Sequence, residues 1–154
     1  MFKNFTLITL LIFTMSCGYE PLHSIKNRVS KSNISIAKIE FIGDRETNIK
    51  IKEKLSSYSD VIKEKHYSLN INSKSLKTIT AKDLKGDPSR FNLSIETIVQ
   101  FNREDNISGE IILRENFKYS NNTDKFELKR YEKEIKRNLA QTITNNLIIK
   151  LSNY

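Results

Sequence analysis

The sequence predicts an α+β fold, a two-layer sandwich in which a four-stranded mixed sheet packs against two helices, the C-terminal one long. Two observations support this prediction. Segments with the alternation of β-strands and segments with helical periodicity follow one another in the order strand, helix, three strands, helix. Each predicted helix has one apolar face, which becomes buried when it packs on a sheet. With 154 residues, of which 38% are hydrophobic, the chain is long enough for a single modest core.

The first 16 residues have the pattern of a secretion signal. The basic Lys3 precedes an uncharged, largely apolar run from Phe5 to Met15. A run of this length is typical of the apolar region of a signal peptide, whereas a membrane-spanning helix needs about 20 apolar residues. The segment therefore predicts export of the chain.

Cys17 is the single cysteine of the chain and follows this run directly. The segment from Thr14 to Cys17 resembles a lipobox, where lipoprotein signal peptidase cuts before a diacylated cysteine. Ser16 fits that pattern, and Thr14 departs from its usual Leu. We expect Cys17 to be lipidated, because an apolar region that ends directly on Ser-Cys-Gly is a specific arrangement. Acylation of both the thiol and the new amino group would give the more than one chain that stable anchoring requires. A free or buried cysteine behind an ordinary signal peptide is the alternative. Gly18 stands where Asp commonly retains lipoproteins in the inner membrane, so we expect the outer membrane, on its periplasmic side.

The expected organisation has three parts. A signal peptide at 1–16 is followed by the lipidated cysteine with a polar tether over 17–33, and a single α+β domain occupies 34–154. The domain begins with a strand over 34–41, rich in β-branched residues. Its apolar positions change parity, which predicts a β-bulge near Ala37 or burial of both faces.

A helix is expected after this strand. Asp44 is placed to cap it, and the helix runs to about Tyr58. Ile49 and Ile51 would also suit a strand. The expected apolar face consists of Ile51, Leu55, Tyr58 and Ile62.

Three strands follow, at 67–72, 91–101 and 109–119. Residues 73–90 are rich in Lys, Ser and Thr and end in a turn signal, so we expect a polar loop there. The alternation of the second strand shifts parity through Ile98 and Val99. The short polar turn before the third strand predicts an antiparallel hairpin.

The clearest element is a long amphipathic helix from about Lys125 to Ser152. Asp124 and Glu127 have the spacing of a capping box, and Glu132 with Lys136 forms a possible i,i+4 pair. We interpret the apolar stripe as core packing against the sheet. The stripe consists of Tyr131, Ile135, Leu139, Ile143, Leu147 and Leu151, widened by Leu128, Ala140 and Ile148.

No pattern in the chain predicts catalysis, a metal or a cofactor. His23 and His66 have no metal-ligand spacing, and Cys17 has no second cysteine to join it. Motifs for phosphate loops, dinucleotides and common hydrolases are missing from the sequence. We expect no enzyme activity. We also expect no nucleic-acid partner, because export removes the chain from nucleic acid and no stacking-aromatic motif accompanies its basic residues.

Together these features resemble the LPS-assembly lipoprotein family (LptE), in its alphaproteobacterial form. The segment from Cys17 to Leu22 reads CGYEPL, which is similar to the C-G-[aromatic]-x-P-L opening of that branch. The remaining chain agrees in length, element order and final helix. The resemblance implies a lipoprotein that plugs a large outer-membrane β-barrel, supports its assembly and helps it insert lipopolysaccharide into the outer leaflet, without covalent chemistry.

The net charge of +8 suggests an anionic partner, although a general excess of Lys would also explain it. Lipopolysaccharide carries phosphates and sugar acids, so its site should present basic side chains near a strand end or loop. Any lysine proposed for such a site could also be a solvated surface charge. By the resemblance, Lys82 and Lys129 fall nearest the basic positions implicated in lipid contact. The candidates are Lys82, Lys85 and Arg90 at the predicted turn, and Lys118, Lys125, Lys129 and Arg130 around the start of the last helix.

Two other functions also fit the sequence. One is a lipid-carrier lipoprotein without a barrel partner, which would need a half-barrel with a deep apolar pocket. The other is a structural envelope lipoprotein that binds peptidoglycan. A plug would instead show a flat sheet covered by two helices.

Overall fold

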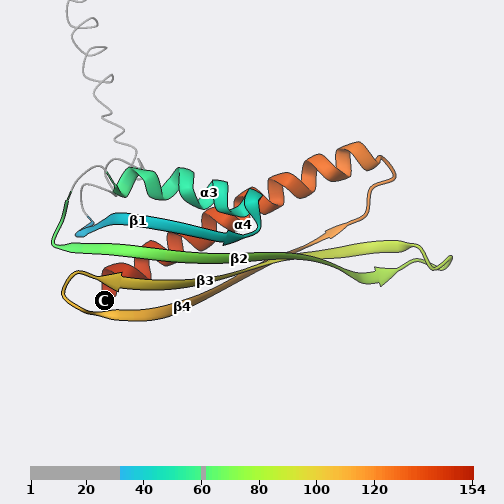
Figure 1. Ribbon diagram of the computed structural model, residues 1–154. Helices are drawn as coiled ribbons and strands as arrows, with labels where there is room; N and C mark the ends of the chain where they lie inside the picture. Colours follow the sequence, from blue (N-terminus) through green and yellow to red (C-terminus); the bar gives the residue numbers. More distant parts are fainter. Residues whose placement is uncertain (1–31, 60–61) are drawn as a thin grey trace, which may run out of the picture.

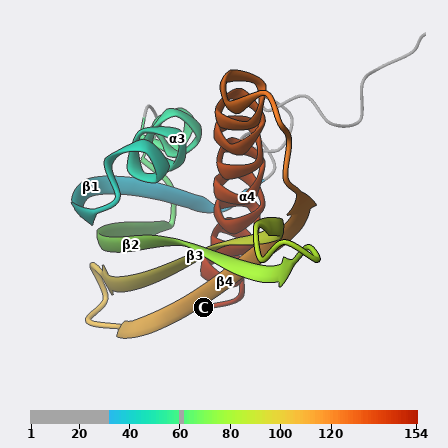
Figure 2. The ribbon, with the colours of Figure 1, turned by 90° about the vertical axis from the view of Figure 1, so that its right-hand side faces the viewer.

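The computed structural model describes residues 32–59 and 62–154, which form a four-stranded sheet with two helices on one of its faces (Figures 1 and 2). This confirms the predicted α+β sandwich and its long C-terminal helix. The predicted signal peptide, Cys17 and all but the last two residues of the predicted tether lie outside the described residues. The elements are β1 (Ile34–Gly43), α3 (Arg45–Leu55), the 3-10 turn η1 (Ser56–Tyr58), β2 (Lys65–Lys82), β3 (Pro88–Arg103), β4 (Ser108–Ser120) and α4 (Lys125–Asn153).

The strands lie side by side in chain order, β1-β2-β3-β4. β1 runs parallel to β2, whereas β2–β3 and β3–β4 are antiparallel. A parallel pair needs a crossover connection, and α3 supplies it. The register of β1 against β2 shifts between Ile36 and Lys38, which confirms the bulge predicted near Ala37.

β2 is much longer than predicted. The expected loop over 73–90 is wrong: β2 continues to Lys82, and only 83–87 connect it to β3. The second half of β2 pairs with β3 along its length, with bulges around Ala81. Most of its side chains are exposed on both faces. This half therefore shows no alternation of apolar and polar residues in the sequence. Its pairing with β3 stabilises it as a strand.

The buried row of β3 is continuous, so the parity shift predicted at Ile98 and Val99 is wrong. Thr97 is fully buried in the same row as Val99, and Ile98 lies on the opposite face. Pairing with β4 is unbroken along this stretch. A threonine in a core position makes the apolar alternation look interrupted in the sequence. The inward row is Phe91, Leu93, Ile95, Thr97, Val99 and Phe101.

Both predicted helix starts are confirmed. The Asp44 carboxylate accepts a hydrogen bond from the Thr47 backbone N–H at 2.8 Å. The Asp124 carboxylate accepts hydrogen bonds from the backbone N–H groups of Phe126 and Glu127. These side chains satisfy donors that the first turn of a helix leaves unpaired.

The first helical segment ends where the sequence predicts. α3 passes into η1, which reaches Tyr58, and Ile51, Leu55 and Tyr58 are buried as expected. Ile62 lies beyond the segment and is 83% exposed, so it does not extend the apolar face.

α4 crosses the sheet beside α3, on the helix-covered face, which we call the inner face (Figure 2). Its predicted stripe is buried except for Tyr131, which is about half exposed, and Ile148, which is partly buried. The predicted pair between Glu132 and Lys136 does not form. Glu132 turns toward the sheet and pairs with Lys77, whereas Lys136 turns toward α3 and pairs with Asp44.

Candidate functional site

The basic residues predicted from the sequence gather at one end of the molecule, to the right in Figure 1. There the β2–β3 turn, the end of β4 and the start of α4 come together. Asn121 joins them: its backbone N–H donates to the Ser89 carbonyl at 2.9 Å, and its Nδ2 donates to the Pro88 carbonyl at 2.7 Å. We call this region the basic end. It is defined by Lys82, Lys85, Arg90, Lys118, Lys129 and Arg130, and Lys125 begins α4 beside them.

The six side chains of the basic end are all exposed. Arg130 is paired with Glu127 at 2.7 Å. The other five form no ion pair within the described part of the chain. Uncommitted ammonium and guanidinium groups can donate charge-assisted hydrogen bonds to phosphate or carboxylate. These five residues can therefore bind an anionic ligand without first breaking internal ion pairs.

These side chains share one end but not one face. Arg90 and Lys118 alternate with the buried Phe91 and Tyr119, so they point to the helix-free face of the sheet, which we call the outer face. Lys129 belongs to the helix layer. A ligand that touched all of them would have to wrap around the end of the sandwich.

The turn that carries Lys85 is built by its neighbours. The Asp83 carboxylate accepts hydrogen bonds from the backbone N–H groups of Lys85 and Asp87, both at 2.9 Å. Gly86 has a φ of +89°, a conformation that residues with a Cβ rarely adopt. The turn signal seen in the sequence is therefore real, but it spans five residues at the tip of a long hairpin.

Exposed apolar side chains lie at the same end, and sequence reasoning missed them. Leu84 projects fully from the turn, and Phe126 in the first turn of α4 is 76% exposed. Ile79, Phe117 and Tyr131 are each about half exposed. A signal was available, since Leu84 and Phe126 each adjoin a charged residue in a segment with no strand periodicity. The end is thus amphipathic, with cations and apolar groups together.

A small cluster beneath the basic end holds α4 on the sheet. The Lys77 ammonium lies 3.9 Å from the centroid of the Phe91 ring and 2.5 Å from Glu132 Oε1. The Tyr119 hydroxyl donates to the same oxygen at 2.8 Å. Burial and the neighbouring Glu132 carboxylate raise the pKa of Tyr119 well above its usual range, so it remains a donor.

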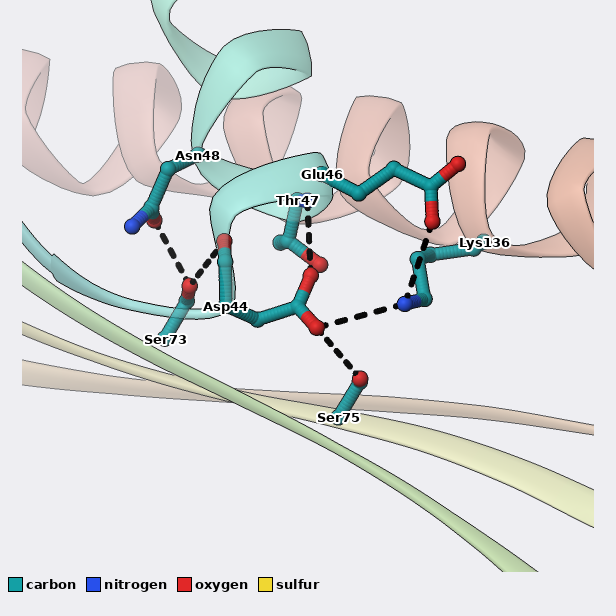
Figure 3. Close-up of polar contacts among 7 residues, drawn as sticks. All are labelled: Asp44, Glu46, Thr47, Asn48, Ser73, Ser75 and Lys136. Atoms are coloured by element: carbon teal, nitrogen blue, oxygen red, sulfur yellow. Dashed lines mark hydrogen bonds and ion pairs between the residues drawn. The ribbon is translucent and has the colours of Figure 1, made fainter.

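A second polar cluster joins α3, β2 and α4 (Figure 3). The Asp44 carboxylate accepts hydrogen bonds from the Ser75 hydroxyl at 2.8 Å and from the Lys136 ammonium at 3.2 Å, besides the Thr47 N–H. Lys136 also lies 3.3 Å from Glu46. Burial alone would raise the pKa of Asp44, but these hydrogen bonds outweigh it and lower the pKa to about 2. The carboxylate is therefore ionised and fully engaged in structural contacts.

A third polar group, outside these two clusters, has the residue types of a catalytic triad. Ser35, His66 and Glu104 do follow one another, with 2.7 Å between Ser35 Oγ and His66 Nδ1 and 3.8 Å between His66 Nε2 and Glu104. Ser35 is only 1% exposed, and its oxygen also accepts the Lys63 backbone N–H. A substrate could not reach this hydroxyl. Among residues 32–59 and 62–154, no group of three His, Cys, Asp or Glu side chains could hold a metal ion.

No sequence model of a known protein family matches the chain, and no curated protein matches it by sequence. Solved structures show a likeness of fold. Rare lipoprotein B from Shewanella oneidensis aligns with a TM-score of 0.56 at 10% identity, over 75% of this chain and 97% of that one. A protein described as a lipoprotein, from Caulobacter crescentus CB15, aligns with a TM-score of 0.53 at 8% identity, over 84% and 93%. This chain has the fold of these bacterial lipoproteins.

A third solved structure agrees. A minor lipoprotein from Acinetobacter baumannii aligns with a TM-score of 0.50 at 13% identity, over 73% of this chain and 91% of that one. Because the identities are so low, the likeness concerns the fold, and function has to be argued from the residues of this chain. None of the helices in the described part of the chain is long and apolar enough to cross a membrane.

Proposed function

We propose that this chain is an outer-membrane lipoprotein that plugs the lipopolysaccharide-transport β-barrel, helps it assemble, and contributes to insertion of lipopolysaccharide into the outer leaflet. Cys17 holds it to the membrane on the periplasmic side. The observation that supports this best is the amphipathic character of the basic end, together with the CGYEPL opening and a fold similar to that of bacterial lipoproteins.

The chemistry of lipopolysaccharide suits this end of the molecule. Its phosphates and sugar acids match the five unpaired cations, and charge-assisted hydrogen bonds are the strongest contacts available to them. Its acyl chains match the exposed side chains of Leu84 and Phe126, which no described segment covers. A ligand with only one of these properties would leave half of the surface unused.

The packing of the domain favours a plug over a lipid carrier. A carrier must hold acyl chains in an apolar cavity inside a curved sheet. Here the buried apolar side chains of the sheet and both helices form one packed cluster. The hollow on the outer face, of about 450 Å³, is lined by charged and amide side chains, among them Lys74, Glu96 and Lys118, together with the exposed Leu76. Such a surface suits contact with protein or with polar sugars.

Affinity purification of the tagged chain from outer membranes tests the proposal. We expect a large β-barrel protein to co-purify in stoichiometric amount, together with lipopolysaccharide. Isolation of the chain without a barrel would contradict the plug and would favour a carrier or a peptidoglycan-binding role, which a murein pull-down would detect.

The anchor needs its own test. Labelling of cells with radioactive palmitate should mark the wild-type chain and leave a Cys17→Ala variant unlabelled. Equal label in both chains would show that Cys17 is not the site of acylation.

A further inference from the structure

β4 presents an open edge of the sheet. It is a terminal strand of 13 residues, without proline, and it pairs with β3 with no register shift from Asn102–Ser108 to Arg90–Ser120. The opposite edge, β1, is interrupted by its bulge. The first part of β4 forms the lower border of the sheet in both Figure 1 and Figure 2. A long, regular edge strand is a template for pairing with another strand, and proteins usually protect such edges.

The positions whose backbone groups face this open edge can be identified. Hydrogen bonds from Arg103 N–H to the Ile107 carbonyl, at 2.8 Å, and from Asn121 N–H to the Ser89 carbonyl, at 2.9 Å, mark the two ends of the β3–β4 ladder. Both place odd-numbered positions in bonds with β3. Because the pattern alternates along an antiparallel pair, even-numbered residues of β4 direct N–H and C=O outward. Their side chains lie on the outer face of the sheet.

The outward positions form a self-complementary row. Glu110, Ile112 and Arg114 follow one another on the outer face, and Ile112 is 42% exposed. The acid and the base lie symmetrically around the apolar residue. When two copies of the strand pair in the antiparallel direction, the acid of each copy therefore lies opposite the base of the other. Such a two-fold contact is isologous, and it places each charge opposite its counterion twice.

We propose that β4 of one molecule pairs antiparallel with β4 of a second copy, with Ile112 opposite Ile112 on the two-fold axis. Glu110 of each copy then lies opposite Arg114 of the other, and about ten backbone hydrogen bonds form between them. On the inner face Ile111 meets Leu113 of the other copy. The two sheets become one continuous sheet.

Other registers that keep the hydrogen-bond pattern are less favourable. A shift that centres the pair on Leu113 places Arg114 opposite Ile112. A shift that centres it on Arg114 brings the two guanidinium groups together, and one that centres it on Glu110 brings the two carboxylates together. Arg114 also pairs with Glu96 of β3 in its own chain. The proposed register therefore extends an existing ion pair into a row of three charges.

The paired segment covers about 108–116 and leaves the basic end free. Lys118 and the turn that carries Lys85 lie beyond it, toward the start of α4. The contact is therefore compatible with ligand binding at that end. It concerns copies of the chain that no barrel encloses, and it does not depend on the proposed function.

Charge exchange between two variants tests the register. The full chain, purified from membranes in detergent, should associate reversibly with itself in sedimentation experiments. Glu110→Lys and Arg114→Glu should each weaken this association at least tenfold, because each variant places like charges opposite one another. An equal mixture of the two should associate again as a heterodimer, in which both pairs are restored.

Lys74→Glu is the matched control. Lys74 lies opposite Glu96 from the β2 side, as Arg114 does from the β4 side, so both variants introduce the same local repulsion. Only Arg114 borders the open edge. The proposal is overturned if the wild-type chain is monomeric at about 100 µM, if Lys74→Glu weakens association as much as Arg114→Glu, or if the mixture fails to recover.

Cross-linking in the cell envelope gives a second measurement. In the proposed register the Cα atoms of the two Ile112 residues would be about 5.5 Å apart, which a disulfide can span. Ile112→Cys should therefore give a reducible adduct of twice the chain mass, whereas Lys74→Cys and the wild-type chain, with Cys17 alone, should not. An adduct of Ile112→Cys with a different protein, and none with itself, would overturn the proposal.

Discussion

At the scale of single residues, Asp44 connects three elements through one carboxylate. Its pKa is about 2 in the folded chain, against an ordinary value of 3.8, because Thr47, Ser75 and Lys136 donate to the ionised form. A lowered pKa means that this stabilisation is present above about pH 4 and is lost as the pH falls toward 2. Asp44→Asn keeps a helix cap and removes the charge. We expect it to lower the free energy of unfolding by about 1 to 2 kcal/mol at neutral pH.

Urea denaturation of the wild type and of Asp44→Asn, from pH 7 down to pH 2, would measure this effect. The difference between the two should shrink as the pH falls. Glu53→Gln, which removes an exposed carboxylate of α3, is the control and should change stability little. A difference for Asp44→Asn that is constant over the whole range would contradict the assigned role of its charge.

At the scale of elements, α4 is held to the sheet at both ends by different means. Its last turn is held by the Tyr67 hydroxyl, which donates to the Leu151 carbonyl at 2.9 Å, and by Lys65, which donates to the Ser152 carbonyl. Its first half depends on Glu132. Glu132→Gln weakens the contact with Lys77, so we expect a loss of about 1 kcal/mol and faster amide exchange at the start of the helix.

Hydrogen exchange with mass spectrometry would resolve the two halves of α4. Exchange should rise over 125–134 and remain unchanged over 143–153. Glu134→Gln removes a neighbouring carboxylate that only pairs along the helix surface with Arg137, and it should alter neither half. Equal effects of the two variants would show that Glu132 has no special role.

At the scale of the whole molecule, the excess of basic residues is either a binding surface or a general feature of the composition. The two can be separated by removing the same charge from different places. A triple variant with Lys82, Lys85 and Arg90 changed to Ser should bind lipopolysaccharide at least tenfold more weakly at low salt. The matched variant changes Lys38, Lys52 and Lys150, which lie on β1, on α3 and at the far end of α4.

Titration of purified lipopolysaccharide at two salt concentrations would compare these variants. If the basic end is the binding surface, the matched variant should bind as the wild type does. If both variants weaken binding equally, net charge alone attracts the ligand, and the basic end has no specific part in it.

The sequence alone determined the features that depend on neighbouring residues. Helix starts at Asp44 and Asp124, the bulge near Ala37 and the order of elements all follow from caps and periodicity within a few positions. The second half of β2 and the buried Thr97 were not predictable in this way. Their state depends on pairing with strands distant in the chain, which no local pattern records.

Only the tertiary structure decided which charges meet. It placed Glu132 against Lys77 of β2, and Lys136 against Asp44 at the start of α3. The reason is that the packing of α4 brings these partners, from segments distant in the chain, next to the two side chains. It brought Lys82 of one hairpin and Lys129 of the last helix to the same end, and set apolar side chains among them. The sequence supplied these residue types, and long-range packing gave them a common surface.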